Sequence, residues 1–141
     1  MRKSRICATR WLVASTALLP ITAHSQIKHP DWVPEAKVEK SLRNLGEFYG
    51  DISSAVNCRK PADKVEAMIC GSDYLAKAEL LNTRASAYAY ENGTKTEVDH
   101  KRYLGKLPRR CKTEQCVYAY FVRETNASLG GESPYEDAAG R

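Results

Sequence analysis

The fold of this chain is decided by residues 58–116, which read CRKPADKVEAMICGSDYLAKAELLNTRASAYAYENGTKTEVDHKRYLGKLPRRCKTEQC. The stretch contains four of the five cysteines, and the fifth, Cys7, lies in a leader segment described below. An even number of cysteines in an exported chain indicates disulfides. A four-thiolate zinc site is the alternative, but spacings of 11 and four intervening residues lack the C-x2-C pairs that zinc usually takes. The sequence therefore predicts a framework of two disulfides.

Two helices are expected inside this stretch. Asp63 and Glu66 form a D-x-x-E capping pattern, which predicts a helix of about two turns that runs to Cys70. Ser72 or Asp73 can cap the next helix, which should be the longest and most central one. Its apolar residues recur at helical spacing: Leu75, Ala78, Leu81, Ala85 and Tyr88.

The four cysteines allow three pairings. If the first helix begins near Asp63, residues 58–62 double back along it, and Cys58 approaches Cys70 within the roughly 7 Å between Cα atoms that a disulfide tolerates. Cys111 and Cys116 lie at a later helix junction. We therefore favour Cys58 with Cys70 and Cys111 with Cys116, because each pair then closes a local loop.

Further helices flank this pair. Thr113 is a good N-cap for a helix from Glu114 to about Leu129. A weaker pattern predicts a helix over residues 97–106, which Gly105 and Pro108 make less regular.

The expected architecture is a small all-α domain over residues 57–129, a disulfide-stapled bundle of four to five helices. Before it, residues 26–56 form a lead-in segment with an amphipathic helix over 34–49. After it, residues 130–141 are polar and without periodicity, which predicts a disordered tail.

Residues 1–25 are typical of a signal peptide. Four basic residues precede an apolar run from Trp11 to Ala23, and Ala23-His24-Ser25 places small residues where a signal peptidase cleaves. The run is about 13 residues long, too short to span roughly 30 Å of hydrocarbon. Because Cys7 precedes the run, it cannot attach a lipid at the cleavage point. We expect a periplasmic or secreted bacterial protein without a membrane anchor after cleavage.

Charge argues against a nucleic-acid partner. The chain has 22 basic and 17 acidic residues, and four of the basic residues but none of the acids lie within the leader, so the mature net charge is +1. Binding to nucleic acid depends on a basic face that displaces counterions.

The residues do not indicate an enzyme. After the leader, only His29 and His100 remain as histidines, and neither a G-x-S-x-G turn nor a phosphate-binding glycine loop is present. The acids that could form a carboxylate pair fit helix-capping or solvated positions better: Glu66, Glu79, Glu97, Asp99 and Glu114. We therefore predict no catalytic residues, no metal site and no cofactor.

The cysteine stretch resembles a known family of small exported helical domains, the lysozyme inhibitor LprI-like N-terminal domain family. The resemblance covers roughly residues 57–129 and rests on four features: the EAMIC sequence of residues 66–70, the helix start at 73–75, the Tyr103-Leu104 pair with arginines before Cys111, and Tyr120-x-x-Arg123 after Cys116. It implies inhibition of lysozyme in the bacterial envelope, and hence a protein partner such as lysozyme or another peptidoglycan hydrolase.

An inhibitor of this kind would push a rigid turn into a cleft that contains two carboxylates. The turn from Cys111 to Cys116 would present Lys112 and Thr113 to those acids, with Arg109 and Arg110 beside them. The alternative reading of these basic residues is a solvated face.

Two other functions remain open. An envelope immunity or adaptor protein would bind a different protein target and would use the helix over residues 34–49 as its interface. A purely structural envelope component is the third possibility.

Overall fold

The computed structural model describes residues 29, 31–98 and 106–138, and Asp31 begins one compact unit. The predicted signal peptide therefore lies outside the described residues, as do His100 and most of the helix predicted over 97–106.

The described residues are all-helical, without a strand, which confirms the expected fold class. The α-helices are α1 (Glu35–Tyr49), α2 (Lys64–Cys70), α3 (Asp73–Glu91) and α5 (Glu114–Leu129), and two single 3-10 turns follow at Gly130–Glu132 and Glu136–Ala138. The helix expected over 34–49 is confirmed as α1.

Local capping chemistry sets where three of these helices begin. Asp63 accepts from the backbone N–H groups of Val65 and Glu66, both at 2.9 Å, and so starts α2. Ser72 starts α3 and Thr113 starts α5, each through its side-chain oxygen. Each cap satisfies amide groups that the first turn of a helix leaves without a partner. The predicted helix starts are therefore confirmed.

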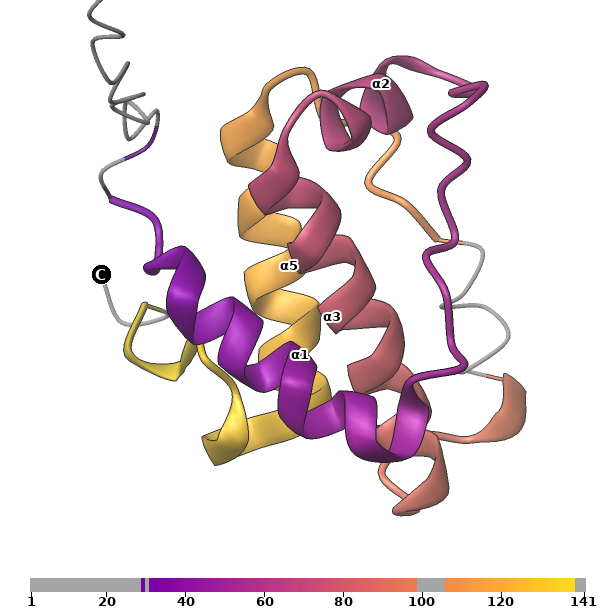
Figure 1. The fold of residues 1–141 in the computed structure, drawn as a ribbon, viewed down its shortest axis with the longest axis vertical. Coiled ribbons are helices and arrows are strands. Elements are labelled where there is room, and N and C mark those ends of the chain that lie inside the picture. Colours follow the sequence, from indigo (N-terminus) through magenta and orange to yellow (C-terminus); the bar gives the residue numbers. More distant parts are fainter. Residues whose placement is uncertain (1–28, 30, 99–105, 139–141) are drawn as a thin grey trace, which may run out of the picture. The chain divides into compact units, whose positions relative to one another are not determined.

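Helix α3 lies at the centre of the bundle, between α1 and α5 (Figure 1). Its alanines at 78 and 85 let the neighbouring helices approach closely, and both are fully buried. The core around them is built from further fully buried residues of all four helices: Val38, Ile69, Leu75, Leu81, Val117 and Phe121.

Two basic residues of α3 fasten α1 to the bundle. Arg84 donates to the carbonyl groups of Leu42, Gly50 and Ile52, each at 3.3 Å, and so replaces the basic residue that α1 lacks in its own last turn. Lys77 lies 2.5 and 2.6 Å from two carboxylates in the first half of α1. Helix α1 therefore packs on the core, as the amphipathic pattern over residues 34–49 predicts, and it belongs to the same compact unit as residues 57–129.

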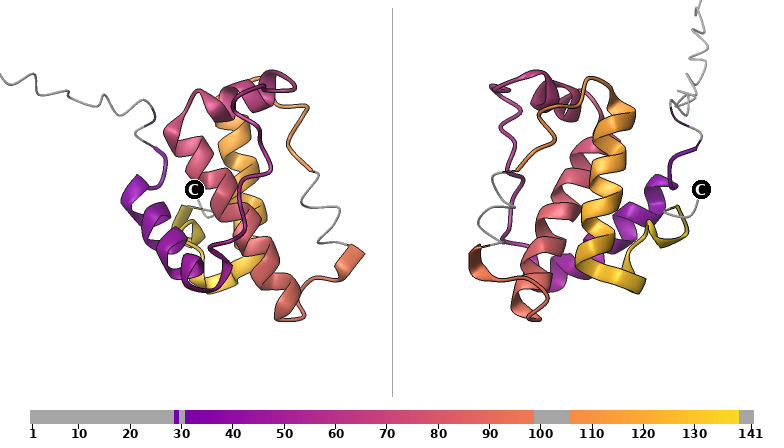
Figure 2. Two further views of the ribbon diagram at one scale, coloured as in Figure 1. Left: turned by 45° about the vertical axis from the view of Figure 1, so that its right-hand side comes forward. Right: turned by 180° about the vertical axis from the view of Figure 1, so that it is seen from behind.

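The prediction of a disordered tail over residues 130–141 is wrong for residues 130–138. Tyr135 is completely buried, and its ring meets that of Tyr118 edge-on at 6.0 Å. Lys37 of α1 lies 3.7 Å from Asp137, and Figure 2 shows this segment turned back beside α1. A segment held by one buried aromatic residue has no periodic pattern of apolar residues, so the sequence does not indicate that it is ordered.

Candidate functional site

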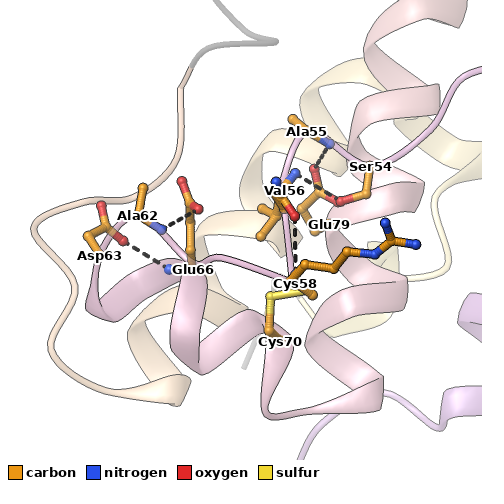
Figure 3. Close-up of a disulfide and its surroundings, with 11 residues drawn as sticks. Ser54, Ala55, Val56, Cys58, Ala62, Asp63, Glu66, Cys70 and Glu79 are labelled. Atoms are coloured by element: carbon orange, nitrogen blue, oxygen red, sulfur yellow. Dashed lines mark hydrogen bonds between the residues drawn. A yellow bond between two sulfur atoms is a disulfide. The ribbon is translucent and has the colours of Figure 1, made fainter.

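The two disulfides join Cys58 to Cys70 and Cys111 to Cys116, with Cα–Cα distances of 5.3 and 5.4 Å. This is the pairing that the sequence favours. The chain from Cys58 doubles back along α2, as expected for a helix that starts at Asp63 (Figure 3). The second bridge closes the turn that leads into α5, so each disulfide fixes one wall of the site described below.

Glu79 anchors the segment that precedes Cys58 and the first disulfide. Its carboxylate accepts from the hydroxyl of Ser54, from the backbone N–H of Ala55 at 3.1 Å and from the hydroxyl of Thr83 at 3.0 Å. The residue is only 2% exposed, so the expectation of a capping or solvated position is wrong. A buried carboxylate with three donors is a structural anchor, and Figure 3 shows it beside the Cys58–Cys70 bridge.

Arg109 joins α2 to the chain that precedes α5. Its guanidinium pairs with the carboxylate of Asp63 and lies 3.4 Å from that of Glu66. The backbone N–H of Glu66 and, after it, this guanidinium hold the pKa of the Asp63 carboxyl below its usual value. Glu66 also accepts from the N–H of Ala62 at 2.8 Å. Arg109, which the sequence predicts to contact a target, thus also clamps two segments of the chain together, and its side chain is still 52% exposed.

The other three predicted binding residues lie on the same turn. Arg110, Lys112 and Thr113 are all exposed. The Thr113 hydroxyl accepts from the N–H of Cys116 at 3.2 Å and so caps α5. Lys112 and Arg110 are therefore exposed cations for which the described part of the chain shows no intramolecular role, and Thr113 holds the turn in place.

A hollow of about 1170 Å³ opens between α2 and this turn, and we call it the α2 groove. Its apolar surface comes from Val65, Ala67, Met68 and Cys111. Its charged side chains are Asp63, Lys64, Arg109, Arg110, Lys112 and Glu114. The sequence did not reveal this site, because its two walls, residues 63–71 and 109–114, are far apart in the chain and meet only in the folded protein.

A second hollow of about 750 Å³ lies on the other side of residues 106–111. Tyr120 lines it, donates to the carbonyl of Lys106 at 3.2 Å and lies under the guanidinium of Arg123, which is 5.2 Å from the ring centre. Arg110 borders both hollows. The segment 106–112 is therefore a basic ridge with a hollow on each side.

Charge is strongly polarised over the described residues. Residues 58–71 and 106–124, which we call the disulfide face, contain eight basic and four acidic side chains, a net charge of +4. The remaining described residues contain six basic and 12 acidic side chains, a net charge of −6. Figure 1 shows α2 and the start of α5 at the same end of the bundle. The described residues, with a net charge of −2, thus include a basic face suited to an acidic partner.

Within the described ranges, no group of three or more His, Cys, Asp or Glu side chains is placed to hold a metal ion. None of the helices described is both long and apolar enough to span a bilayer.

Fold and site together define a small all-helical domain, stapled by two disulfides, with a rigid basic face. Comparison with protein-family models, with curated proteins and with solved structures finds no match to this chain.

Proposed function

We propose that this chain is an exported binding protein that inhibits a lysozyme-type peptidoglycan hydrolase by placing the Cys111–Cys116 turn in the catalytic cleft. One observation carries the proposal. The turn is fixed at three points, by its disulfide, by the Thr113 cap and by the Arg109 clamp, yet Lys112 and Arg110 remain exposed.

Such a turn suits an acidic cleft for two reasons. Glycosidase clefts contain a pair of carboxyl groups, and the Lys112 ammonium and Arg110 guanidinium can donate charge-assisted hydrogen bonds to them. A turn that is already ordered loses little conformational entropy on binding. The resemblance of residues 57–129 to the LprI-like family points to the same kind of target, and disulfides persist in the oxidising compartments where such hydrolases act.

The test is lysis of bacterial cell walls by lysozymes of animal and of bacterial-toxin type, with the oxidised protein added in increasing amounts. We expect dose-dependent protection that reduction abolishes. Lys112→Glu should weaken inhibition about 30-fold or more, because a carboxylate would then face the carboxylates of the cleft. The matched control is Lys40→Glu on the exposed side of α1, which should leave inhibition unchanged. A folded, oxidised protein that protects against neither class of lysozyme refutes the proposal.

A second candidate is an envelope immunity or adaptor protein that binds a different protein through α1. The observation that favours it is Phe48, which is 79% exposed at the end of that helix. Removing α1 cannot test this idea, because Arg84 and Lys77 tie the helix into the core. Phe48→Glu is the better variant. Loss of partner capture in that variant, with lysozyme inhibition absent from the parent, would favour the second function.

A further inference from the structure

The proposed role of the Cys111–Cys116 turn does not account for the α2 groove, which is large and partly lined by apolar side chains. Its volume of about 1170 Å³ exceeds the roughly 300–1,000 Å³ of ordinary small-molecule sites. Ala67 and Met68 of α2 provide accessible apolar lining, and Cys111 lines the groove from the other wall. An open groove of this size fits a short segment of chain better than a single small molecule.

The rim of the groove is basic. Lys64, Arg110 and Lys112 are exposed around it, on both walls. Of the two acids that line it, Asp63 is paired with Arg109, and Glu114 stands at the first position of α5. An occupant with carboxylates on either side of an apolar side chain would therefore complement both the rim and the floor.

Both walls are held in place before anything binds. The Cys58–Cys70 disulfide and the Asp63 cap fix α2, while the Cys111–Cys116 disulfide fixes the opposite wall. Arg109 spans the two walls through its pairs with Asp63 and Glu66. The groove is thus preformed, so its occupant alone has to become ordered.

We propose that the α2 groove receives an acidic protein segment whose carboxylates pair with Lys64, Arg110 and Lys112 while one apolar side chain lies against Met68 and Ala67. The inference rests on the proposed function in one respect only, that the partner is a protein.

The test uses a defined probe, the peptide Ac-Glu-Glu-Leu-Glu-Glu-NH2, with amide chemical shifts of the oxidised full chain as the readout. At millimolar peptide we expect shifts confined to residues 64–71 and 109–114. Replacing the leucine of the peptide by serine should weaken binding about ten-fold or more, because the apolar burial is lost. The peptide Ac-Lys-Lys-Leu-Lys-Lys-NH2 should not bind.

Charge-reversed variants provide the matched control. Lys64→Glu combined with Lys112→Glu should abolish the shifts, whereas Lys40→Glu combined with Arg43→Glu makes the same change of charge on the exposed side of α1 and should leave them intact. Shifts that are absent, that lie elsewhere or that the lysine peptide reproduces would overturn the inference. So would a peptidoglycan stem peptide that binds more tightly than the acidic leucine peptide, because the groove would then be a cell-wall site.

The two proposals fail separately. Peptide binding without inhibition of any lysozyme rejects the proposed function and leaves the groove as an acidic-segment site. Inhibition that is unchanged in Lys64→Glu, with no peptide binding, rejects the groove and leaves the turn as the inhibitory element.

Discussion

The two disulfides are expected to have different roles: Cys58–Cys70 mainly stabilises the fold, and Cys111–Cys116 orders the turn that presents Lys112. Removing them one at a time tests each role separately. The paired variants are Cys58→Ala with Cys70→Ala, and Cys111→Ala with Cys116→Ala. The cysteines of the first pair are 12 residues apart in sequence and those of the second pair are five apart. Restricting the unfolded chain over loops of these lengths gives about 3 and about 2 kcal/mol of stabilisation, respectively.

Urea unfolding measures these losses directly, with far-UV circular dichroism as the signal. Both variants should still fold, because the caps, the Arg109 clamp and the apolar core remain. The variant without Cys58–Cys70 should unfold at the lower urea concentration. In the lysis assay the variant without Cys111–Cys116 should be the weaker inhibitor, because the turn that presents Lys112 is no longer held in one conformation.

Two results would refute this reasoning. A loss below about 1 kcal/mol on removing Cys58–Cys70 would show that the crosslink does not stabilise by restricting the unfolded chain. Full inhibitory strength in a folded variant without Cys111–Cys116 would show that a preordered turn is not what binds. Fully reduced wild-type protein is the control for both, since it should show the two losses together.

Three further predictions concern stability. Tyr135→Ala should cost about 3–5 kcal/mol in urea unfolding, because its ring is completely buried; a loss near zero would mean that the last turns do not pack on the core. Asp63 has a lowered pKa because it accepts from the backbone N–H of Glu66 and faces a guanidinium, so its contribution is present above its unfolded pKa of about 3.9 and is lost as the pH falls below it. Asp63→Asn keeps the cap and should flatten the fall of melting temperature in acid; an unchanged acid profile would contradict this. The hydrogen bond to Glu91 raises the pKa of Tyr49 to about 12, so stability that is present below pH 10 should be lost between about pH 10 and 12, and Tyr49→Phe should remove that dependence in alkaline urea titrations.

Local chemistry explains what could be predicted from the sequence. The starts of three helices depend on side chains that cap amides two or three residues away, so Asp63, Ser72 and Thr113 were visible without the fold. The disulfide pairing was accessible for the same reason, because each bridge joins the two ends of a short loop.

What could not be predicted depends on partners that are distant in sequence. Arg109 looked like a free cation until Asp63, 46 residues earlier, came within reach. Glu79 looked solvated because Ser54 lies 25 residues before it, on the segment that covers it. The basic disulfide face was hidden because the net charge of a sequence says nothing about where the charges lie in the fold.

The order of the disulfides along the chain has a consequence for how this protein matures. In the described region every cysteine is bonded to the next cysteine in sequence, Cys58 to Cys70 and Cys111 to Cys116. An oxidant that joins neighbouring thiols in chain order therefore produces the native bonds directly. The first bridge can close before the second pair of cysteines has been oxidised. Oxidative folding of this domain should thus require a thiol oxidase but no disulfide isomerase.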